Sequence, residues 1–325
     1  MRQQLKFPDF GIVPTGISPT SIVTQAHISF LRDIQMDPEV DTDKIHQKAV
    51  AEVAAIRLFF PDVRTEAIQI CMAAWLSTLC TIDDILEEMD PPAAEAALGQ
   101  SIEIVLGQNE LDLKVYLTPH KNQVAFIMTR LRNYCSHHLT VPTAEDFLAE
   151  VANVCKGLVS ELDYRGGSST GLGKRDLSTY LQIRVRTIGI GPFFALIRHL
   201  YCSGSRKQAD MIGLQRAVSL AAGLQNDLIG LEKDLRNGES MNAVVVALRD
   251  MGREASDQNC LREATCRVTH IHNECVEAIF MMLEGWNKNE FAGMADEVSC
   301  CRVIAAFVES HMKWCASAKR YQLTI

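Results

Sequence analysis

Apolar side chains recur along most of the chain at steps of three and four residues, which is the period of a helix that buries one face. The pattern is clear over residues 43–60 and predicts a helix there. Its apolar positions are Ile45, Ala49, Val53, Ile56 and Phe60. Pro61 and Asp62 are expected to end this helix, because proline cannot continue the backbone hydrogen-bond pattern.

A second, longer helix is expected over residues 64–88. It contains the nearly continuous apolar stretch IQICMAAWLSTLCTI, which predicts a central position surrounded by other helices. Pro91 and Pro92 are expected to stop this helix. Further helices are predicted over 93–106, 122–138, 144–164, 176–202, 206–236, 241–252, 259–287 and 296–320.

The remaining signals favour an all-α fold. No series of short alternating segments predicts a sheet, and no internal repeat is visible. Residues 1–20 carry three prolines and two glycines and are expected to form an irregular lead-in. RGGSSTGLG at 165–173 lacks the GK[ST] ending of a phosphate-binding loop, and no strand precedes it, so a flexible connector is favoured. We therefore expect a single all-α domain over 1–325.

Composition and charge narrow the possible partners. Of the 325 residues, 47% are hydrophobic and 22% are charged, as in an ordinary globular protein. The net charge of −8 and the lack of a strongly basic run disfavour nucleic acid, because its binding depends on clustered lysine and arginine. An acidic protein that binds an anionic substrate needs metal ions or a local basic cluster.

The cysteines and the amino terminus indicate a cytoplasmic protein. The eleven cysteines form no CxxC pair, and the adjacent Cys300 and Cys301 lack zinc-ligand spacing, so reduced and mostly buried thiols are expected. The first residues, MRQQLKFPDF, contain no apolar signal core. No apolar run approaches the roughly 18 residues of a membrane span, so none is expected.

Four acidic residues stand at the end of the second predicted helix, in DDILEE at 83–88. Asp83, Asp84, Glu87 and Glu88 occupy adjacent parts of one helix face, where their charges repel. Binding of Mg²⁺, which prefers oxygen ligands, would relieve that repulsion. The alternative is a solvated acidic helix end, but delivery by a strongly apolar helix favours the rim of a pocket.

A second candidate metal motif is NDLIGLEKD at 226–234. Asn226, Gly230 and Asp234 are spaced by four residues and share one helical stripe, so two side-chain oxygens lie two turns apart. A glycine inside a helix costs about 1 kcal/mol relative to alanine, so Gly230 either gives a metal or water room or serves helix packing. Lys233 is a candidate diphosphate ligand or an ordinary surface lysine paired with a carboxylate.

A basic segment complements these acids. In YLQIRVRTIGIGP at 180–192, Arg184 and Arg186 lie in an apolar helix that breaks at Gly189, Gly191 and Pro192. An arginine in such a segment requires an anionic partner, because an unpaired buried charge is costly. A bound anion and a structural salt bridge both meet that requirement.

Together these motifs resemble those of the microbial (bacterial and fungal) class I terpene synthases. DDILEE resembles their aspartate-rich motif, and NDLIGLEKD is similar to their second motif, NDxx(S/T/G)xxK(D/E). The resemblance implies that Asp83 bridges two Mg²⁺ ions and that Asn226 and Asp234 hold a third, with Mn²⁺ as a possible substitute. Gly230 stands where Ser or Thr is common, so water is expected in place of that hydroxyl ligand. Either glutamate of DDILEE fits the family's remaining acid.

Residues 180–192 are similar to the family's diphosphate-sensing segment. By that match Arg184 is the sensor, Thr187 is the linker, and the Ile188 carbonyl faces the allylic carbon of the substrate; Arg186 competes for the sensor role. Near the carboxyl terminus, Arg320-Tyr321 is similar to an Arg-Tyr pair that folds over the diphosphate in family members. The four elements occur in the family's order and span residues 83–321.

The resemblance implies a Mg²⁺-dependent cyclase with a helical bundle around a central apolar cavity. It would ionise a linear prenyl diphosphate, most simply C15 farnesyl diphosphate, and close the carbocation into a sesquiterpene hydrocarbon or alcohol. Three Mg²⁺ ions with Arg184, Lys233, Arg320 and Tyr321 would neutralise the departing diphosphate. Ordinary helix packing is the alternative role for each of the candidate cavity residues. These are Trp75, Leu76, Leu79, Cys80, Phe193, Phe194, Ser219, Ala222, Phe307 and Trp314.

Other functions are weighed against this one. C20 geranylgeranyl diphosphate, the substrate of a diterpene cyclase, and a C10 substrate stay open beside C15, because pocket volume depends on side chains from several helices. A chain-elongating prenyltransferase resembles this class in fold but carries two DDxxD motifs, so the Asn-led second motif favours cyclisation. A class II cyclase needs DxDD, which is absent. A helical binding or scaffold protein would carry acidic patches without turnover. Zinc binding by His270 and His272, or by His137 and His138, lacks a partner at ligand spacing. A monomer and a homodimer both fit.

Overall fold

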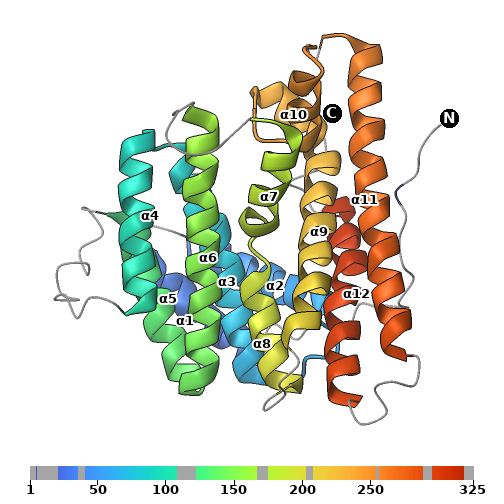
Figure 1. Ribbon diagram of the computed structural model, residues 1–325. Helices are drawn as coiled ribbons and strands as arrows, with labels where there is room; N and C mark the ends of the chain where they lie inside the picture. The colour runs from blue at the N-terminus through green and yellow to red at the C-terminus, as the bar shows by residue number, and fades with distance from the viewer. Residues whose placement is uncertain are drawn as a thin grey trace. The chain divides into compact units, whose positions relative to one another are not determined.

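Helices form all of the regular structure in the residues that the structure describes. The computed structural model describes residues 5, 21–35, 41–107, 122–166, 175–202, 208–253, 256–287 and 295–317. Figure 1 shows the helices in chain order. They are α1 Ile22–Ile34, α2 Thr42–Phe59, α3 Glu66–Glu87, α4 Pro91–Leu106, α5 Gln123–His138, α6 Val141–Gly166, α7 Leu177–Thr187, α8 Gly191–Tyr201, α9 Gln208–Asn237, α10 Ala243–Asp250, α11 Gln258–Asn287 and α12 Ala295–Ser317. The predicted all-α fold class is confirmed.

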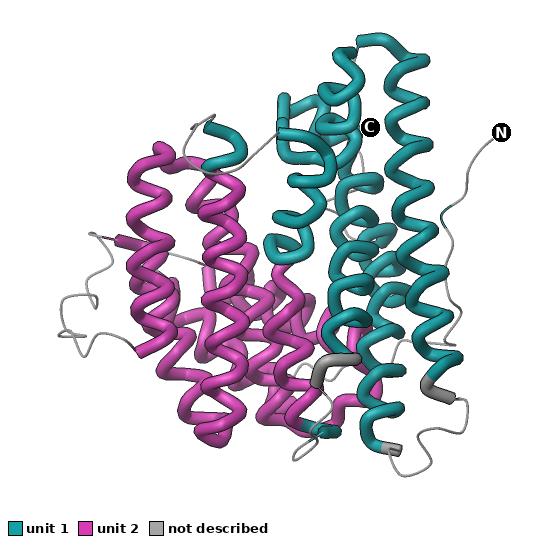
Figure 2. The backbone as a smooth tube through the Cα atoms, in the orientation of Figure 1, with its two compact units in different colours: residues 1–12, 163–188, 200–325 teal, residues 13–162, 189–199 magenta. Residues whose placement is uncertain are grey.

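The chain divides into two compact units (Figure 2). Unit 1 contains residues 1–12, 163–188 and 200–325, and unit 2 contains residues 13–162 and 189–199. Along the chain, the division falls near the end of α6, between α7 and α8, and again near the end of α8. The single-domain description of the chain stays a prediction.

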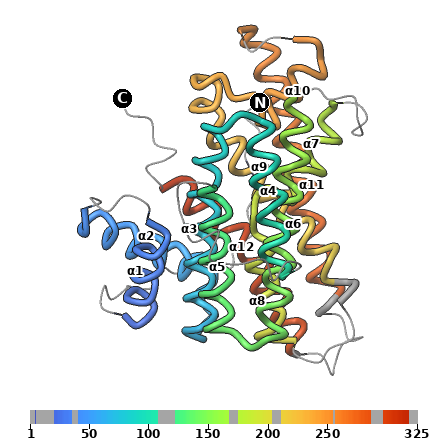
Figure 3. The backbone as a smooth tube through the Cα atoms, turned by 90° about the vertical axis from the view of Figure 1, so that its left-hand side faces the viewer, coloured from blue at the N-terminus to red at the C-terminus, as the bar shows by residue number. Residues whose placement is uncertain are grey.

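In unit 2, α3 is the central helix. It packs against α1, α2 and α5 (Figure 3). Every side chain from Ile68 to Thr78 is buried, so no face of this part of the helix meets solvent. This confirms the central position expected from its continuous apolar stretch.

Two prolines play a different part from the one predicted. The helix α3 ends at Glu87, before the prolines are reached. Pro91 and Pro92 instead form the first turn of α4, where Asp90 caps the helix and its Oδ1 accepts a hydrogen bond from the Ala93 N–H at 3.0 Å. Proline is well tolerated there because the first N–H groups of a helix have no partner within it.

The helix α3 is also long and apolar enough to cross a membrane, by length and composition alone, although no uninterrupted apolar run of that length is present. In the structure, 67% of its most apolar 18-residue window is buried inside the protein. Such burial is the pattern of a core helix.

In unit 1, α9 packs against α7, α10, α11 and α12. A hydrophobic cluster joins the end of α6 to α7, α9, α10 and α11, with Tyr164 and Tyr180 among its largest side chains. The aromatic rings of these two tyrosines lie 6.3 Å apart. This cluster fixes α7 and α10 on the stretch of α9 that carries the second motif.

Other differences from the predicted elements are local. The helix α1 is absent from the prediction, and the run 176–202 is divided into α7 and α8. The expected lead-in at 1–20 lies outside the described residues except for Leu5, and most of the loop at 165–173 does as well. All eleven cysteines are free, and six of them are buried. Their reduced state stays a prediction.

Candidate active site

The DDILEE motif lies at the C-terminal end of α3, directly after its buried apolar stretch. Asp83 is half-buried, and Asp84 and Glu87 are exposed on the last turn of the helix. Glu88 is exposed and forms the C-cap. Four carboxylates on neighbouring positions provide the hard oxygen donors that Mg²⁺ requires, so the residues fit the metal expected here.

Gly189, in the break between α7 and α8, is hydrogen-bonded to α3 within unit 2. The Trp75 indole Nε1–H donates a hydrogen bond of 2.7 Å to the Gly189 carbonyl oxygen, and both groups are buried. Gly189 has a φ of +74°, and a Cβ added to it would lie 2.3 Å from Leu79 Cδ2. Trp75 lies two turns before Asp83, and Leu79 lies one turn before it. The residues of α3 that contact the break are therefore on the same helix as the acidic motif.

We expect Gly189→Ala to lower the free energy of unfolding by about 3 kcal/mol, because it combines a positive φ with steric overlap at Leu79. Denaturant unfolding measures the change. Gly99→Ala in α4 is the matched control: its new Cβ meets nothing within 4 Å, and we expect a small gain of about 0.5–1 kcal/mol. Equal effects of the two substitutions would show that the break tolerates a side chain.

The two predicted residues before the break differ in exposure. Thr187 is buried, and its Oγ1 has no hydrogen-bond partner among the described residues. Ile188 is half-buried and caps α7 by donating its N–H to the Arg184 carbonyl oxygen at 3.1 Å. A buried hydroxyl without a partner is uncommon in folded proteins.

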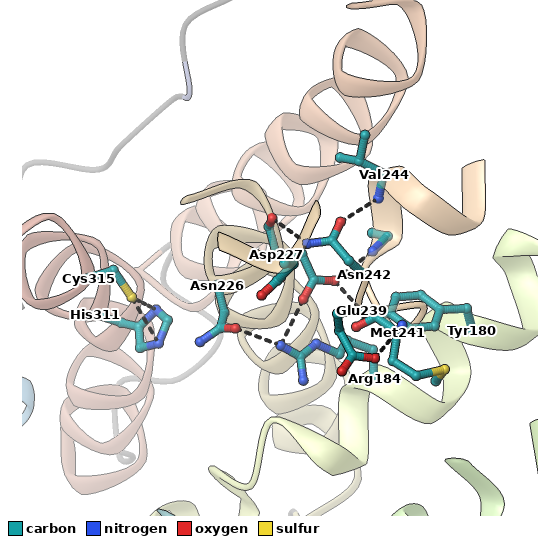
Figure 4. Close-up of polar contacts among 12 residues, drawn as sticks. Tyr180, Arg184, Asn226, Asp227, Glu239, Met241, Asn242, Val244, His311 and Cys315 are labelled. Carbon is teal, nitrogen blue, oxygen red and sulfur yellow. Dashed lines mark hydrogen bonds and ion pairs between the residues drawn. The ribbon is translucent and has the colours of Figure 1, made fainter. Parts of the chain in front are cut away.

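In unit 1, Arg184 joins α7 to the second motif (Figure 4). Its Nη2 lies 3.0 Å from Asn226 Oδ1 and 2.8 Å from Asp227 Oδ1. The side chain passes over Gly223, where an added Cβ would lie 2.9 Å from Arg184 Cγ. Arg186 is exposed. The salt bridge considered for this arginine is therefore present: Arg184 is half-buried, and its partner Asp227 belongs to the second motif itself.

Asp227 is the anchor of this arrangement, although its position in the motif predicted no role for it. Its Oδ2 accepts hydrogen bonds from the Tyr180 hydroxyl at 2.7 Å and from the Ala243 N–H at 3.1 Å. Burial raises the pKa of Asp227, and the charge of Arg184 and the Tyr180 hydrogen bond oppose that rise. Tyr180 lies one helical turn before Arg184, so the i, i+4 spacing of a tyrosine and an arginine was the available signal.

The predicted ligands of the second motif present oxygens along one side of α9. Asn226 Oδ1 accepts the hydrogen bond from Arg184, and Asp234 Oδ2 accepts one from Asn242 Nδ2 at 2.8 Å. A Cβ added to Gly230 would lie 3.4 Å from Asp234 Oδ2, so the carboxylate folds back over the glycine. Lys233 is half-buried and makes no ion pair with a described residue.

Neither acidic motif forms a compact cluster of metal-binding side chains in this structure. The described part of the chain contains no group of three His, Cys, Asp or Glu side chains placed to hold a metal ion. The second motif contributes an asparagine and a single acid at its ligand positions, and the first spreads its acids over the end of α3. Amide and carboxylate oxygens nevertheless match a hard cation bound together with substrate oxygens.

A buried polar chain runs beside Asn226. Gln225 Nε2 donates to the Val308 carbonyl oxygen at 3.1 Å and contacts His272 Nε2 at 3.2 Å, while its Oε1 lies 2.9 Å from His311 Nδ1. This pattern assigns the His311 proton to Nδ1. The Cys315 thiol lies 3.6 Å from His311 Nε2. Burial, with the charge of Arg184, lowers the pKa of His311 to about 3.

The His311 imidazole is therefore expected to stay neutral in the fold while the unfolded chain gains a proton below pH 6.5. Stability from this group is complete above pH 6.5 and falls as the pH falls towards 3. By pH 5 the loss is about 2 kcal/mol, at about 1.4 kcal/mol per pH unit. Urea unfolding of the wild type and of His311→Gln from pH 7.5 to pH 5 measures the loss as the difference between the two, because burial lowers the pKa of His272 as well.

His311→Gln should reduce this acid sensitivity, because the glutamine amide can donate to Gln225 and does not titrate. His270→Gln is the matched control, since His270 is exposed and pairs with Glu274 at 3.2 Å. An unchanged pH slope in His311→Gln would contradict the assignment of the acid sensitivity to His311.

The candidate cavity residues lie in the interiors of their own units. Trp75, Leu76, Phe193 and Phe194 are buried in unit 2, with Leu79 and Cys80 half-buried; Ser219, Ala222 and Phe307 are buried in unit 1, with Trp314 half-buried. Their contact with a substrate stays a prediction. Arg320 and Tyr321 lie outside the described residues.

The histidines considered for zinc have other surroundings. His272 belongs to the polar chain of Gln225, and His270 pairs with Glu274. The rings of His137 and His138 meet edge to face at the end of α5, with centroids 5.3 Å apart. None of them has a cysteine or acid partner arranged as a metal site among the described residues.

Comparison with solved structures defines the class of protein. The chain is similar to linalool/nerolidol synthase from Streptomyces clavuligerus (TM-score 0.65, 18% identity), with 90% of this chain and 94% of that chain covered. It is similar to aristolochene synthase from Penicillium roqueforti (TM-score 0.63, 17% identity; 91% and 94% covered) and to hedycaryol synthase (TM-score 0.60, 17% identity; 95% and 99% covered). At these identities the likeness shows the fold, which is that of the class I terpene synthases.

The family follows from the sequence itself. The model of terpene synthase family 2, C-terminal metal binding, matches residues 74–278, a range that includes DDILEE, Arg184 and NDLIGLEKD. No curated protein matches the chain. The chain belongs to terpene synthase family 2. The resemblance noted from its motifs is confirmed, and the protein is a class I terpene synthase.

Proposed function

We propose that this terpene cyclase is Mg²⁺-dependent and converts farnesyl diphosphate into a sesquiterpene hydrocarbon or alcohol, with release of diphosphate. The observation that carries the proposal is the contact of Arg184 with Asn226 and Asp227, at 3.0 and 2.8 Å. It joins the candidate diphosphate sensor to the second metal motif within the family match. We expect a cytoplasmic enzyme, as a monomer or a homodimer.

The proposed metal ligands are the oxygens of both motifs. Asp83, Asp84 and Glu87 or Glu88 would serve two ions, and Asn226 and Asp234 a third, with water at Gly230. Bound Mg²⁺ supplies the positive charge that stabilises a departing diphosphate. Asp234 Oδ1 has no hydrogen-bond partner among the described residues, which supports its proposed availability as a ligand.

The protein's cations would bind and orient the diphosphate. Arg184 can donate from several N–H groups of a planar guanidinium, a geometry that suits phosphate oxygens. Lys233 would add a point charge one residue before Asp234, and Arg320 with Tyr321 would cover the leaving group. Thr187 and Ile188 would follow any movement of Arg184, because they complete the same helix end.

The hydrocarbon part of the substrate requires a dry, apolar enclosure, since water would quench an allylic cation. Aromatic faces such as those of Trp75, Phe193 and Phe307 stabilise nearby positive charge. The C15 chain length is proposed because a helical chain of this size resembles microbial sesquiterpene cyclases.

The test is a product analysis. Purified protein with Mg²⁺ is incubated separately with C10, C15 and C20 prenyl diphosphates, and the extracts are analysed by gas chromatography with mass detection. A cyclic product from the C15 substrate alone, lost with EDTA, is expected. A product from another length corrects the substrate. A longer linear diphosphate, formed only with added isopentenyl diphosphate, would move the chain to the elongating enzymes.

A further inference from the structure

We infer that Asn242 is a positioning residue for the second metal motif, which holds the Asp234 carboxylate so that a single oxygen remains for the metal. The inference rests on the proposed function, since it takes Asp234 as a metal ligand. Asn242 stands outside NDLIGLEKD, at the N-cap of α10. It lies eight residues beyond Asp234 in the chain.

Both amide N–H groups and the amide oxygen of Asn242 make hydrogen bonds. Figure 4 shows Asn242 with two of its partners, Asp227 and Val244. Its Oδ1 accepts from the Val244 N–H at 2.9 Å, which is the helix cap. Its Nδ2 donates to the Asp227 carbonyl oxygen at 2.7 Å and to Asp234 Oδ2 at 2.8 Å. The amide therefore links two points on α9 that are two turns apart to the first turn of α10.

Capping alone does not explain this residue. Serine, aspartate and asparagine cap helices almost equally well, because each needs only an oxygen that accepts from the first turn. Asparagine is distinguished from the others by its two N–H donors. Both donors are used on α9 here, and the residue is completely buried, at 0% exposure. The contact with Asp234 is thus made by the part of the side chain that the cap does not need.

Gly230 completes the arrangement. The Asp234 carboxylate lies over it, with Oδ2 at 3.4 Å and Oδ1 at 3.8 Å from the position of an added Cβ. Asn242 holds Oδ2 and thereby fixes the rotation of the carboxylate. In a motif without a hydroxyl at 230, fixing one acid in this way lowers the cost of ordering the remaining ligands around a cation.

The test compares Asn242→Ser with the wild-type chain. Serine keeps a capping oxygen and removes both amide donors. Mg²⁺ is titrated calorimetrically into the full chain in the presence of inorganic diphosphate, and thermal unfolding is followed without metal. We expect the Mg²⁺ affinity to fall about 10-fold or more, as for other residues that orient a metal ligand, and added Mg²⁺ to restore saturation.

Asn122→Ser is the matched control. Asn122 caps α5 by accepting from the Ala125 N–H at 3.0 Å, and its amide donates to Gln100. The control should lose thermal stability without losing Mg²⁺ affinity. If Asn242→Ser does not fold, Asn242→Thr replaces it, because threonine also keeps a capping oxygen, lacks the amide donors and adds no charge beside Asp234. Unchanged or tighter Mg²⁺ binding in the folded variant overturns the inference.

Asn226→Ala separates this outcome from failure of the proposed function. If Asn226→Ala abolishes Mg²⁺–diphosphate binding and Asn242→Ser leaves it unchanged, the positioning role alone is wrong. If Asn226→Ala binds as the wild type does, the second motif is not the metal site, and the proposed function itself has failed.

Discussion

Asn226→Ala is expected to abolish product formation, with a loss of turnover of at least about 100-fold, because one of the two proposed oxygen ligands on α9 is removed and the leaving diphosphate loses stabilisation. The fold should survive. Arg184 loses a hydrogen bond of 3.0 Å to Asn226 but keeps its ion pair of 2.8 Å with Asp227. The variant should therefore be a folded protein without activity.

The measurement is a single-turnover product assay at several Mg²⁺ concentrations, combined with thermal unfolding. Asn153→Ala is the control: Asn153 is exposed on α6, and its amide donates to Glu150 at 3.3 Å. The control should keep full turnover. Turnover of Asn226→Ala within about 10-fold of the wild type would remove Asn226 from the catalytic machinery, since even a residue outside the ligand set costs that much.

Helical periodicity predicted most of the fold, because the core helices bury continuous or regularly spaced apolar faces. Residues 43–60 became α2, and the apolar stretch before DDILEE became the buried centre of unit 2. The helix α1 was missed even though Val23, Phe30 and Ile34 have helical spacing and Ser21 is a good cap. The prolines and glycines just before it concealed the pattern.

The candidate site shows what periodicity leaves out. Spacing alone placed Asn226, Gly230 and Asp234 on one stripe of a helix. It gave no partner to Asp227, whose contacts come from Tyr180 on α7 and from the first turn of α10. Such contacts depend on how helices pack, and packing joins residues whose distance in the chain carries no signal.

The role of Asn242 could not be predicted from the sequence for the same reason. In the sequence it is one more asparagine before an apolar run, which predicts a helix cap and nothing else. Its contacts with α9 appear only once α10 is folded against that helix. The choice between Arg184 and Arg186 was open for the same reason, because two residues of spacing turn a side chain by more than half a helical turn.

Arg184→Ala is expected to lower the free energy of unfolding by about 3–5 kcal/mol and to abolish turnover. The stability loss follows from burial: Asp227 is 1% exposed and would keep a charge without its partner. The loss of turnover follows from the proposed contact with diphosphate. A loss of both quantities does not by itself separate a structural arginine from one that binds substrate.

The double variant Arg184→Ala/Asp227→Asn separates them. Asparagine keeps the shape at 227 and removes the charge, so folding should recover most of the lost stability. Turnover should not recover, because the guanidinium is still missing. Denaturant unfolding at pH 7 measures the first quantity, and product formation with Mg²⁺ measures the second.

Arg186→Ala is the internal control, since Arg186 is exposed two residues further along the same helix. It should change neither stability nor turnover. Recovery of turnover in the double variant would show that Arg184 serves only as the partner of Asp227. A loss of turnover in Arg186→Ala would transfer the sensor role to Arg186. In either case, the role of Arg184 would be structural: its salt bridge of 2.8 Å with Asp227 would support the second motif, and Arg184 would not contact the substrate.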